Sequence, residues 1–531
     1  MKAKRKVKRF LAAALACTLA LSVVGCGKKG AENNGGQVGE GIYDGTYPIK
    51  TDKTLTVYIP LESNAAQSVK NLGDTEFAKE FERQTGVKVE YQHPSNGSSE
   101  SFNLMLASDT LPDIICHYWP DFPGGAAKAV KDGYIIDTTE LTKKYAPNYT
   151  KLLEENPEWK KYVTTDDHKM FGFPAITEVQ SSGGLIIRQD WLDDLGLEMP
   201  ETIDEWEQVL TAFRDKKGAK APLSMDTSGF RSGAFAGAFG LQLGWFVDNG
   251  ELKYGYYEES YRDFLTKMND WYNKGLFDNN FSTSDSKVFT ANILNGKSGA
   301  TYGGITGGIA KFNSAKEGSD PKYKVVAAPF PTAKKGTVPE FGQYSPNVGV
   351  FYMAISTSCK DPELATRWID YAYSKQGQMI YNYGVEGESY TMQDGKPVYT
   401  DKILNPTGDD TTGKVLSYYA KPYNGYASVT LLDAYKQTLK TDEMKNAYEV
   451  WGNTNQKNHL FPSLYPTSDE QSEIANIQNA IDTYVREMFI KFVMGVEPLS
   501  SFDDYCANLR QMGVEKLIEL KNAAYKRSMS R

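Results

Sequence analysis

The spacing of hydrophobic and polar positions predicts a strand–helix–strand unit near the start of the main body of the chain. Residues 55–59 and 87–91 each alternate apolar with polar side chains, and a period of two is typical of strands. Between them, residues 74–85 place their apolar side chains on one helical face, and Gly86 is a typical helix stop.

A second helix, predicted over residues 99–107, and a buried strand, predicted over 111–116, continue this order. Strands that alternate with helices indicate a parallel sheet with right-handed crossovers. Ligands of such sheets bind beyond the carboxyl ends of the strands. The candidate binding loops are therefore residues 61–64, 93–98 and 117–120.

The last part of the chain has a helical pattern. Apolar residues recur at helical spacing over 474–493, which predicts a packed core helix. Ser501 with Asp504 resembles a capping box, and we expect it to begin a final helix that runs to about Leu520.

The first residues have a different pattern. Six basic and no acidic residues precede Phe10, an apolar run follows to Val24, and Gly25 and Cys26 end it. This is the layout of a secretory signal peptide. The alternative is a transmembrane helix, but the run is shorter than the roughly 20 residues that span a bilayer.

A cysteine directly after a small residue resembles the lipoprotein box of bacteria. That resemblance implies that residues 1–25 are a signal peptide and that Cys26 carries the lipid, with palmitate among its acyl chains; a cleaved signal with a coincidental cysteine is the alternative. Residues 26–50 are rich in Gly, Asn and charge, which predicts a flexible tether. The expected location is the extracellular face of the cell membrane, through the lipid anchor.

Composition narrows the function. A chain of 531 residues has room for two or more domains, and its net charge of −8 without a basic block in the body argues against nucleic acid as a partner. The cysteines of the body, Cys116, Cys359 and Cys506, are distant and odd in number, and the four histidines lack metal-ligand spacing. We therefore expect no metal and no cofactor.

Aromatic residues are abundant, with 8 Trp and 34 Tyr, and many follow predicted strands or lie in loops. A flat ring covers the C–H face of a sugar, while polar groups pair with its hydroxyls. Candidate stacking residues are Tyr118, Trp119, Trp245 and Tyr302. The alternative for each is an aromatic side chain that packs in the core.

Five segments in a fixed order carry a family pattern: 74–89, 111–115, 187–206, 295–303 and 384–399. The second reads Leu-Pro-Asp-Ile-Ile and the fourth Asn-Gly-Lys-Ser-Gly-Ala-Thr-Tyr-Gly. Together they resemble the extracellular solute-binding proteins of carbohydrate ABC importers, family 1, and especially the large lipoprotein branch of Gram-positive bacteria. The resemblance extends from about residue 53 to the C-terminus.

This resemblance implies an α/β, two-lobed periplasmic-binding-protein-like fold of the maltose-binding type, with hinge crossovers and C-terminal helices. Lobe 1 would comprise residues 51–175 and 345–410, and lobe 2 residues 180–340 and 425–531. The chain would cross between the lobes near residues 173–184, 341–349 and 407–426.

The resemblance also places a ligand cleft between the lobes. By position, its expected residues are Asn64, Asn96, Tyr118 and Trp119 from lobe 1, Glu178, Asp226, Arg231, Trp245 and Tyr302 from the hinge and lobe 2, and Glu386, Glu388 and Tyr390 at the rim of lobe 1. The family often has a tryptophan just after the Tyr302 position. Here Gly303, Gly304 and Ile305 stand there, which leaves room for a bulkier ligand.

The implied function is the lipid-anchored substrate-binding component of an ABC importer. It would capture an oligosaccharide by closure of two lobes, deliver it to the transmembrane subunits of a permease, and be a monomer rather than an enzyme. One alternative is the same fold with a peptide or another non-sugar nutrient. Another is a surface glycosidase, which needs two carboxylates roughly 5–10 Å apart; the sequence does not display such a pair.

Overall fold

The computed structural model describes residues 43–531 except 95–98, 109, 120, 121, 422 and 424. Cys26, the predicted signal peptide and Asn96 lie outside the described residues, as does the predicted tether up to residue 42. Within the described ranges, no helix combines the length and the apolar character that crossing a membrane requires.

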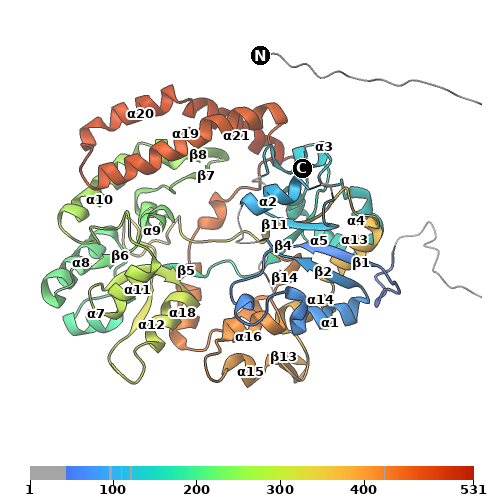
Figure 1. Ribbon diagram of the computed structural model, residues 1–531. Helices are drawn as coiled ribbons and strands as arrows, with labels where there is room; N and C mark the ends of the chain where they lie inside the picture. The colour runs from blue at the N-terminus through green and yellow to red at the C-terminus, as the bar shows by residue number, and fades with distance from the viewer. Residues whose placement is uncertain (1–42, 95–98, 109, 120–121, 422, 424) are drawn as a thin grey trace, which may run out of the picture. The chain divides into compact units, whose positions relative to one another are not determined.

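A six-stranded sheet forms the centre of lobe 1, with strand order β14-β4-β11-β3-β1-β2 (Figure 1). The strands are β1 (Thr54–Tyr58), β2 (Lys88–Gln92), β3 (Ile114–His117), β4 (Phe173–Thr177), β11 (Val348–Ile355) and β14 (Ser428–Thr430). β2 and β3 pair with β1 in parallel, as the sequence predicts, and β11 runs antiparallel to both of its neighbours. All strands except β11 therefore point their carboxyl ends to one edge of the sheet.

Helices cover this sheet on both faces and bury its apolar residues. They are α1 (Glu76–Thr85), α2 (Ser99–Leu106), α3 (Gly125–Lys131), α4 (Thr139–Tyr145), α5 (Pro147–Glu155), α6 (Lys160–Val163), α13 (Pro362–Tyr371) and α14 (Lys375–Tyr383). The Thr75 hydroxyl accepts a hydrogen bond from the N–H of Ala78 at the start of α1, and Gly86 ends the helix at φ 74°. A Cβ on Gly86 would lie 2.4 Å from the Ile49 carbonyl oxygen, so both backbone and space require glycine.

A smaller module follows α14 and packs around buried tyrosines and Ile403. It consists of the hairpin β12 (Tyr390–Gln393) and β13 (Lys396–Tyr399) with α15 (Asp401–Leu404) and α16 (Thr412–Tyr419). Its helix α16 contacts η1 (Ala65–Gln67), the turn that follows β1. The module therefore belongs to lobe 1.

Lobe 2 is built on a four-stranded mixed sheet of order β10-β5-β9-β6. Its strands are β5 (Gly183–Arg188), β6 (Leu223–Ser224), β9 (Ala300–Gly304) and β10 (Val325–Ala328), and a separate hairpin pairs β7 (Trp245–Asp248) with β8 (Glu251–Tyr254). The helices are α7 (Gln189–Leu195), α8 (Ile203–Lys217), α9 (Thr227–Arg231), α10 (Ser260–Asn273), α11 (Ser286–Leu294), α12 (Lys311–Ser314) and α18 (Asp442–Gly452), with the π-helical turn η8 (Ile305–Ala310) after β9. Helix α17 (Leu432–Gln437) lies between the lobes, because Ala434 is buried in the small module and Tyr435 packs on the core of lobe 2.

Three C-terminal helices pack on the core of lobe 2: α19 (Ser468–Val493), α20 (Phe502–Gln511) and α21 (Val514–Ser528). The predicted core helix is α19. The predicted single last helix is wrong, because Gly513 at φ 92° separates α20 from α21. The predicted capping box is wrong as well, because the Ser501 hydroxyl donates to the Glu497 carboxylate and accepts no backbone N–H of the helix.

Two chain segments cross between the lobes side by side. Residues 178–182 join β4 to β5, and residues 341–347 lead into β11. The Ser345 N–H donates to the Gln180 carbonyl at 2.7 Å, and the Thr177 N–H donates to the Asn347 carbonyl at 2.7 Å. These bonds tie the two crossing segments together next to lobe 1.

The third crossing differs from its predicted position. Residues 425–430, expected in lobe 2, contribute β14, which pairs in parallel with β4 in the lobe 1 sheet. The chain enters lobe 2 only after Thr430. It then contacts lobe 1 once more, because Tyr465, between α18 and α19, is buried in the lobe 1 core. Nonlocal strand pairing decides the first point and nonlocal core packing the second, so neither can be predicted from a local sequence pattern.

Candidate functional site

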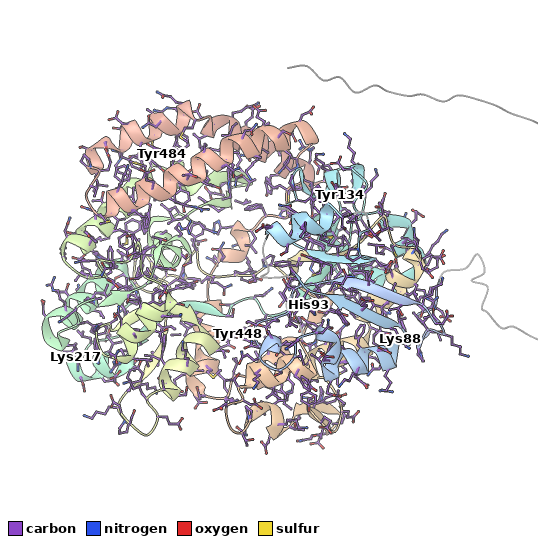
Figure 2. All side chains as sticks on the ribbon, in the orientation of Figure 1. Lys88, His93, Tyr134, Lys217, Tyr448 and Tyr484 are labelled. Carbon is purple, nitrogen blue, oxygen red and sulfur yellow. The ribbon has the colours of Figure 1, made fainter. Side chains whose placement is uncertain are left out.

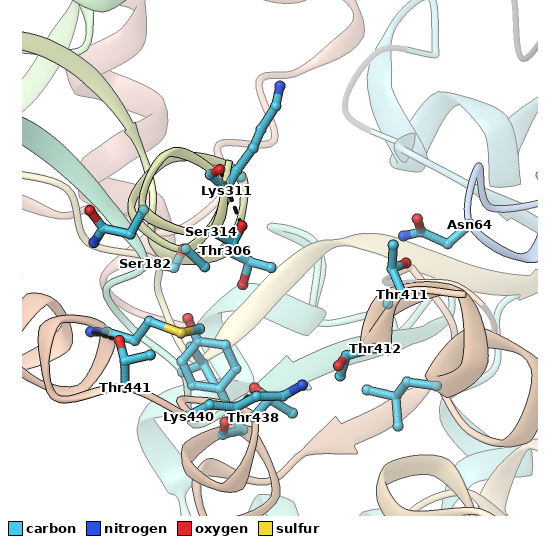
Figure 3. A pocket seen from close by; sticks show the side chains of 18 of the residues that line it. Asn64, Ser182, Thr306, Lys311, Ser314, Thr411, Thr412, Thr438, Lys440 and Thr441 are labelled. Atoms are coloured by element: carbon cyan, nitrogen blue, oxygen red, sulfur yellow. Dashed lines mark hydrogen bonds between the residues drawn. The ribbon is translucent and has the colours of Figure 1, made fainter. Parts of the chain in front are cut away.

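A large cavity lies beside the segments that cross between the lobes. Its volume is about 1490 Å³, and lobe 1, the crossing segments and lobe 2 all contribute to its walls (Figure 3). Thr177 and Thr430 line it at the carboxyl ends of β4 and β14. The cavity thus occupies the edge of the sheet at which parallel strands place ligands.

The lobe 1 wall brings together two segments that are distant in sequence. Asn64 precedes η1, and its N–H and Nδ2 groups donate to the Glu62 carboxylate at 2.6 and 3.2 Å. Thr411, Thr412 and Gly413 begin α16, whose first turn is capped by the Thr411 hydroxyl. A Cβ on Gly413 would lie 3.4 Å from Asn64 Nδ2, an ordinary van der Waals distance, so the two segments are direct neighbours in this wall.

The lobe 2 wall has two parts. One is η8, where Thr306 and Gly307 line the cavity and Gly308 packs so tightly that a Cβ would lie 2.5 Å from Ile186 Cδ1. The other joins α17 to α18, where Thr438, Lys440 and Thr441 face the cavity. Hydroxyl groups therefore occur on both walls, as Figure 3 shows for Thr306, Thr411, Thr412, Thr438 and Thr441.

Lys421 is the most unusual charged group of the lobe 1 wall. Burial lowers the pKa of its ammonium to about 8. Its side chain makes no hydrogen bond and no ion pair with any described residue. A half-buried cation without an acceptor is costly, and a ligand that supplies one would compensate.

The structure places the predicted site residues in several environments. Asn64 lines the cavity. Glu178 lies in a crossing segment between Thr177 and Val179, both of which line the cavity, but its own carboxylate accepts the N–H of Leu432 at 2.8 Å. It therefore orders the entry into α17.

Tyr118 and Trp119 follow β3 but differ in exposure. Tyr118 is half-buried, and its ring lies 5.8 Å from that of Phe351 at the same sheet edge. Trp119 is 0 % exposed, and its Nε1 donates to the Tyr352 carbonyl at 3.2 Å. The expectation that Trp119 offers a stacking surface is therefore wrong in this structure, because Phe102 and Phe122 pack against its ring.

The four predicted residues of lobe 2 do not line the cavity. Asp226 caps α9 by accepting the Gly229 N–H at 2.8 Å, and Arg231 lies against the Tyr256 hydroxyl. Trp245 packs on Tyr254 with ring centroids 4.7 Å apart, and the Lys521 ammonium lies 5.0 Å from its ring. Tyr302 lies against the Ser232 side chain. Each of these contacts is internal to lobe 2 and its C-terminal helices.

The predicted rim residues build the small module after α14. Glu388 forms an ion pair with Lys402, and Glu386 is exposed. Tyr390 is buried against Tyr383, with ring centroids 5.8 Å apart. None of the three lines the cavity; the same module contributes α16 instead.

Sequence reasoning missed most of the cavity wall. Thr411–Gly413 follows a Gly-Asp-Asp turn that reads as a solvated loop, and Lys421 and Lys440 carry no motif. A run of hydroxyl residues around glycine is the one local signal, and it is weak. Thr411–Gly413 reaches the cavity wall because α16 packs against η1.

The comparisons with known proteins agree with this architecture. The sequence profile of the bacterial extracellular solute-binding proteins matches residues 66–379, more than half of the chain. The fructooligosaccharide ABC transporter substrate-binding protein FusA of Streptococcus pneumoniae is 25% identical, over 98% of both chains. The lipoprotein LipO of Bacillus subtilis is 24% identical over 90% of this chain and 93% of its own.

Solved structures share the fold. The alginate-binding protein AlgQ2, in its form without calcium ion, superposes with a TM-score of 0.71 at 22% identity, over 90% of this chain and 99% of its own. FusA in complex with kestose gives a TM-score of 0.70 at 23% identity over 90% of this chain and 100% of its own. The two-lobed α/β fold predicted from the sequence is thus confirmed, and the chain belongs to the bacterial extracellular solute-binding protein family.

Proposed function

We propose that this protein is the substrate-binding component of an ABC importer, and that it captures an oligosaccharide in the cavity between its lobes. The observation that carries the proposal is the composition of the cavity walls, to which both lobes contribute. A ligand that contacts both walls binds the closed arrangement more tightly and shifts the population toward it.

The size and chemistry of the cavity support a sugar. Its volume of about 1490 Å³ exceeds the roughly 300–1,000 Å³ of pockets for drug-sized ligands. Threonine and serine hydroxyls, which both donate and accept hydrogen bonds, suit the hydroxyls of a sugar chain. The half-buried Tyr435 adds aromatic surface to the lining.

The relatives support the same substrate class. FusA is named for fructooligosaccharides, and YtcQ of Bacillus subtilis, 23% identical over 85% of this chain, is named a polygalacturonan/rhamnogalacturonan-binding protein. These are binding proteins by name, which favours capture without turnover.

The remaining parts of the proposal rest on the sequence. Cys26 would carry the lipid that holds the protein on the extracellular face of the membrane, and the permease subunits would recognise the closed lobes. We further propose that the protein acts as a monomer, which size-exclusion chromatography with light scattering tests directly.

A thermal-shift screen tests the function. The full-length chain, purified in mild detergent, is heated with oligosaccharides, monosaccharides and peptides, and the ligand solutions are then analysed for products. A ligand at a hundredfold excess over Kd stabilises the folded state by about 2.7 kcal/mol. We expect a shift with one class of oligosaccharide and no product. A shift with peptides alone would exclude the sugar, and shorter sugars among the products would indicate a glycosidase.

A further inference from the structure

Positive charge is concentrated on the walls of the cavity. The lysines that line it are Lys311, Lys316, Lys421 and Lys440. No carboxylate lies within ion-pair distance of any of the four, as far as the described residues show. The acidic residues of the lining, Glu317 and Asp320, are exposed in the loop that follows α12. In a protein of net charge −8, this local excess of unpaired cations needs an explanation.

Neighbouring lysines show the contrast. Lys414 of α16 pairs with Asp410 at 2.6 Å, one turn from the Thr411–Gly413 wall. Lys324, next to the lining residue Tyr323, pairs with Glu443 at 2.9 Å. Carboxylates are therefore available near both walls but do not neutralise the lysines that line the cavity.

Lys421 is fixed in place by its backbone. Its N–H donates to the Tyr381 carbonyl at 2.8 Å, and its φ of 25° lies in the left-handed region that residues other than glycine rarely adopt. Strained residues of this kind occur at ligand sites because the surrounding structure holds them there. The fixed backbone keeps an ammonium group without a partner in the lobe 1 wall.

Lys440 belongs to the opposite wall, between α17 and α18. Its ammonium donates to the Leu404 carbonyl, a neutral acceptor in the module of lobe 1. Figure 3 shows its side chain pointing toward Thr412. Lysines from both walls thus face one cavity.

We propose that this cavity selects an acidic oligosaccharide, whose rings carry carboxylate or sulfate groups, and that Lys421 and Lys440 bind these groups from opposite walls. This inference rests on the proposed function and names its substrate class. A neutral sugar offers hydroxyl acceptors but leaves the positive charges uncompensated. An anion forms charge-assisted hydrogen bonds, which are about twice as strong as neutral ones.

Lobe closure strengthens this preference. Closure removes water from the cavity, so that repulsion among the lysines grows as the effective dielectric constant falls. An anion bound between them turns that repulsion into attraction. The acidic ligand therefore favours the closed arrangement more than a neutral ligand with the same rings.

Isothermal titration calorimetry on the full-length chain in mild detergent tests the proposal with matched ligand pairs. Short oligogalacturonates and oligomannuronates are each compared with their carboxyl-reduced forms, and sulfated galactan fragments with their desulfated forms. We expect one acidic member to bind about tenfold tighter or more than its neutral partner, with an affinity that falls as salt rises.

Charge-removing variants locate the effect. Lys421→Gln and Lys440→Gln should each weaken binding of the acidic member about tenfold and so reduce its advantage over the neutral member. Lys88→Gln is the matched control, because Lys88 begins β2 at the opposite end of the strands from the cavity (Figure 2). Circular dichroism checks folding, and if Lys421→Gln fails to fold, Lys440→Gln and the salt dependence decide.

The outcomes separate this inference from the proposed function. Equal binding within every pair, or binding of neutral members alone, overturns the acidic preference and leaves the oligosaccharide importer intact. Binding of peptides and of no oligosaccharide overturns both. The carboxylate and sulfate arms identify which anionic group is bound.

Discussion

A cluster of charged residues joins lobe 1 to the C-terminal helices, and we expect it to stabilise the protein measurably. Asp166, in the loop between α6 and β4, accepts hydrogen bonds from Arg527 Nε at 2.5 Å and Arg531 Nε at 3.0 Å. Arg527 also reaches Glu470 of α19. The Arg531 side chain is 0 % exposed, donates to the Lys161 carbonyl at 3.0 Å and stacks over Tyr465.

The magnitude follows from burial. Asp166→Ala leaves the buried Arg531 without its carboxylate, and removal of one partner of a buried ion pair costs about 3–5 kcal/mol. Arg531 keeps its carbonyl acceptors, so we expect a loss near the lower end, about 3 kcal/mol. Arg527 is one-third exposed and retains Glu470, so Arg527→Ala should cost about 1 kcal/mol or less.

Urea unfolding, followed by tryptophan fluorescence and by far-ultraviolet circular dichroism, measures these losses. A double-mutant cycle isolates the pair: Asp166→Ala combined with Arg531→Ala should show a coupling free energy of about 2 kcal/mol. Lys445→Ala is the control, because its ion pair with Asp442 is exposed and should contribute less than about 0.5 kcal/mol. A loss below 1 kcal/mol for Asp166→Ala, or a coupling near zero, would refute the reasoning.

Three further changes test other parts of the structure. Cys26→Ser should move the protein from the membrane fraction to the medium and abolish labelling with radioactive palmitate. Cys17→Ser is the control and should change neither, because Cys17 lies inside the apolar run that ends at Val24; retention of the label by Cys26→Ser would contradict the anchor. Gly184→Ala should reduce the free energy of unfolding by about 2 kcal/mol, because its Cβ would lie 2.5 Å from the ring of Trp451; Gly452→Ala, which meets open space, is the control in the same urea assay. Burial raises the pKa of Asp370 from 3.8 to about 7. Between pH 4 and pH 7 the Asp370 carboxyl group therefore keeps its proton in the folded state and loses it in the unfolded state. Stability should therefore fall as pH rises from about 4 to 7, by at most about 1.4 kcal/mol per pH unit, and Asp370→Asn should flatten this slope; an unchanged slope would show that another group titrates.

The spacing of apolar residues correctly predicted several helices and strands. The alternation at 55–59 and 87–91 became β1 and β2, and the apolar face of 74–85 with its glycine stop became α1. The period of apolar residues states which side of an element is buried, and this requires no knowledge of what covers it. The helical repeat that predicted α19 worked for the same reason.

The candidate site depended on contacts between distant parts of the chain. Trp119 and Tyr118 are adjacent in sequence, yet only Trp119 is enclosed. Phe102 and Phe122 pack against its ring, and the Tyr352 carbonyl, 233 residues away, accepts its Nε1 hydrogen bond. The assignment of 425–430 to lobe 2 failed because β14 finds its partner in β4. Site residues that are placed by their position in a family pattern carry no information about such distant contacts.

The sequence by itself therefore determined the helices and strands with strong periodicity and the two-lobed fold that the family pattern implies. Only the tertiary structure decided which aromatic residues are buried, where the chain crosses for the third time, and which lysines share a cavity. The physical reason is that the burial of a side chain and the pairing of its charge depend on which other residues surround it in the folded protein. In this protein those surroundings are assembled from segments as distant as Asn64 and Gly413, whose side-by-side placement creates one wall of the cavity.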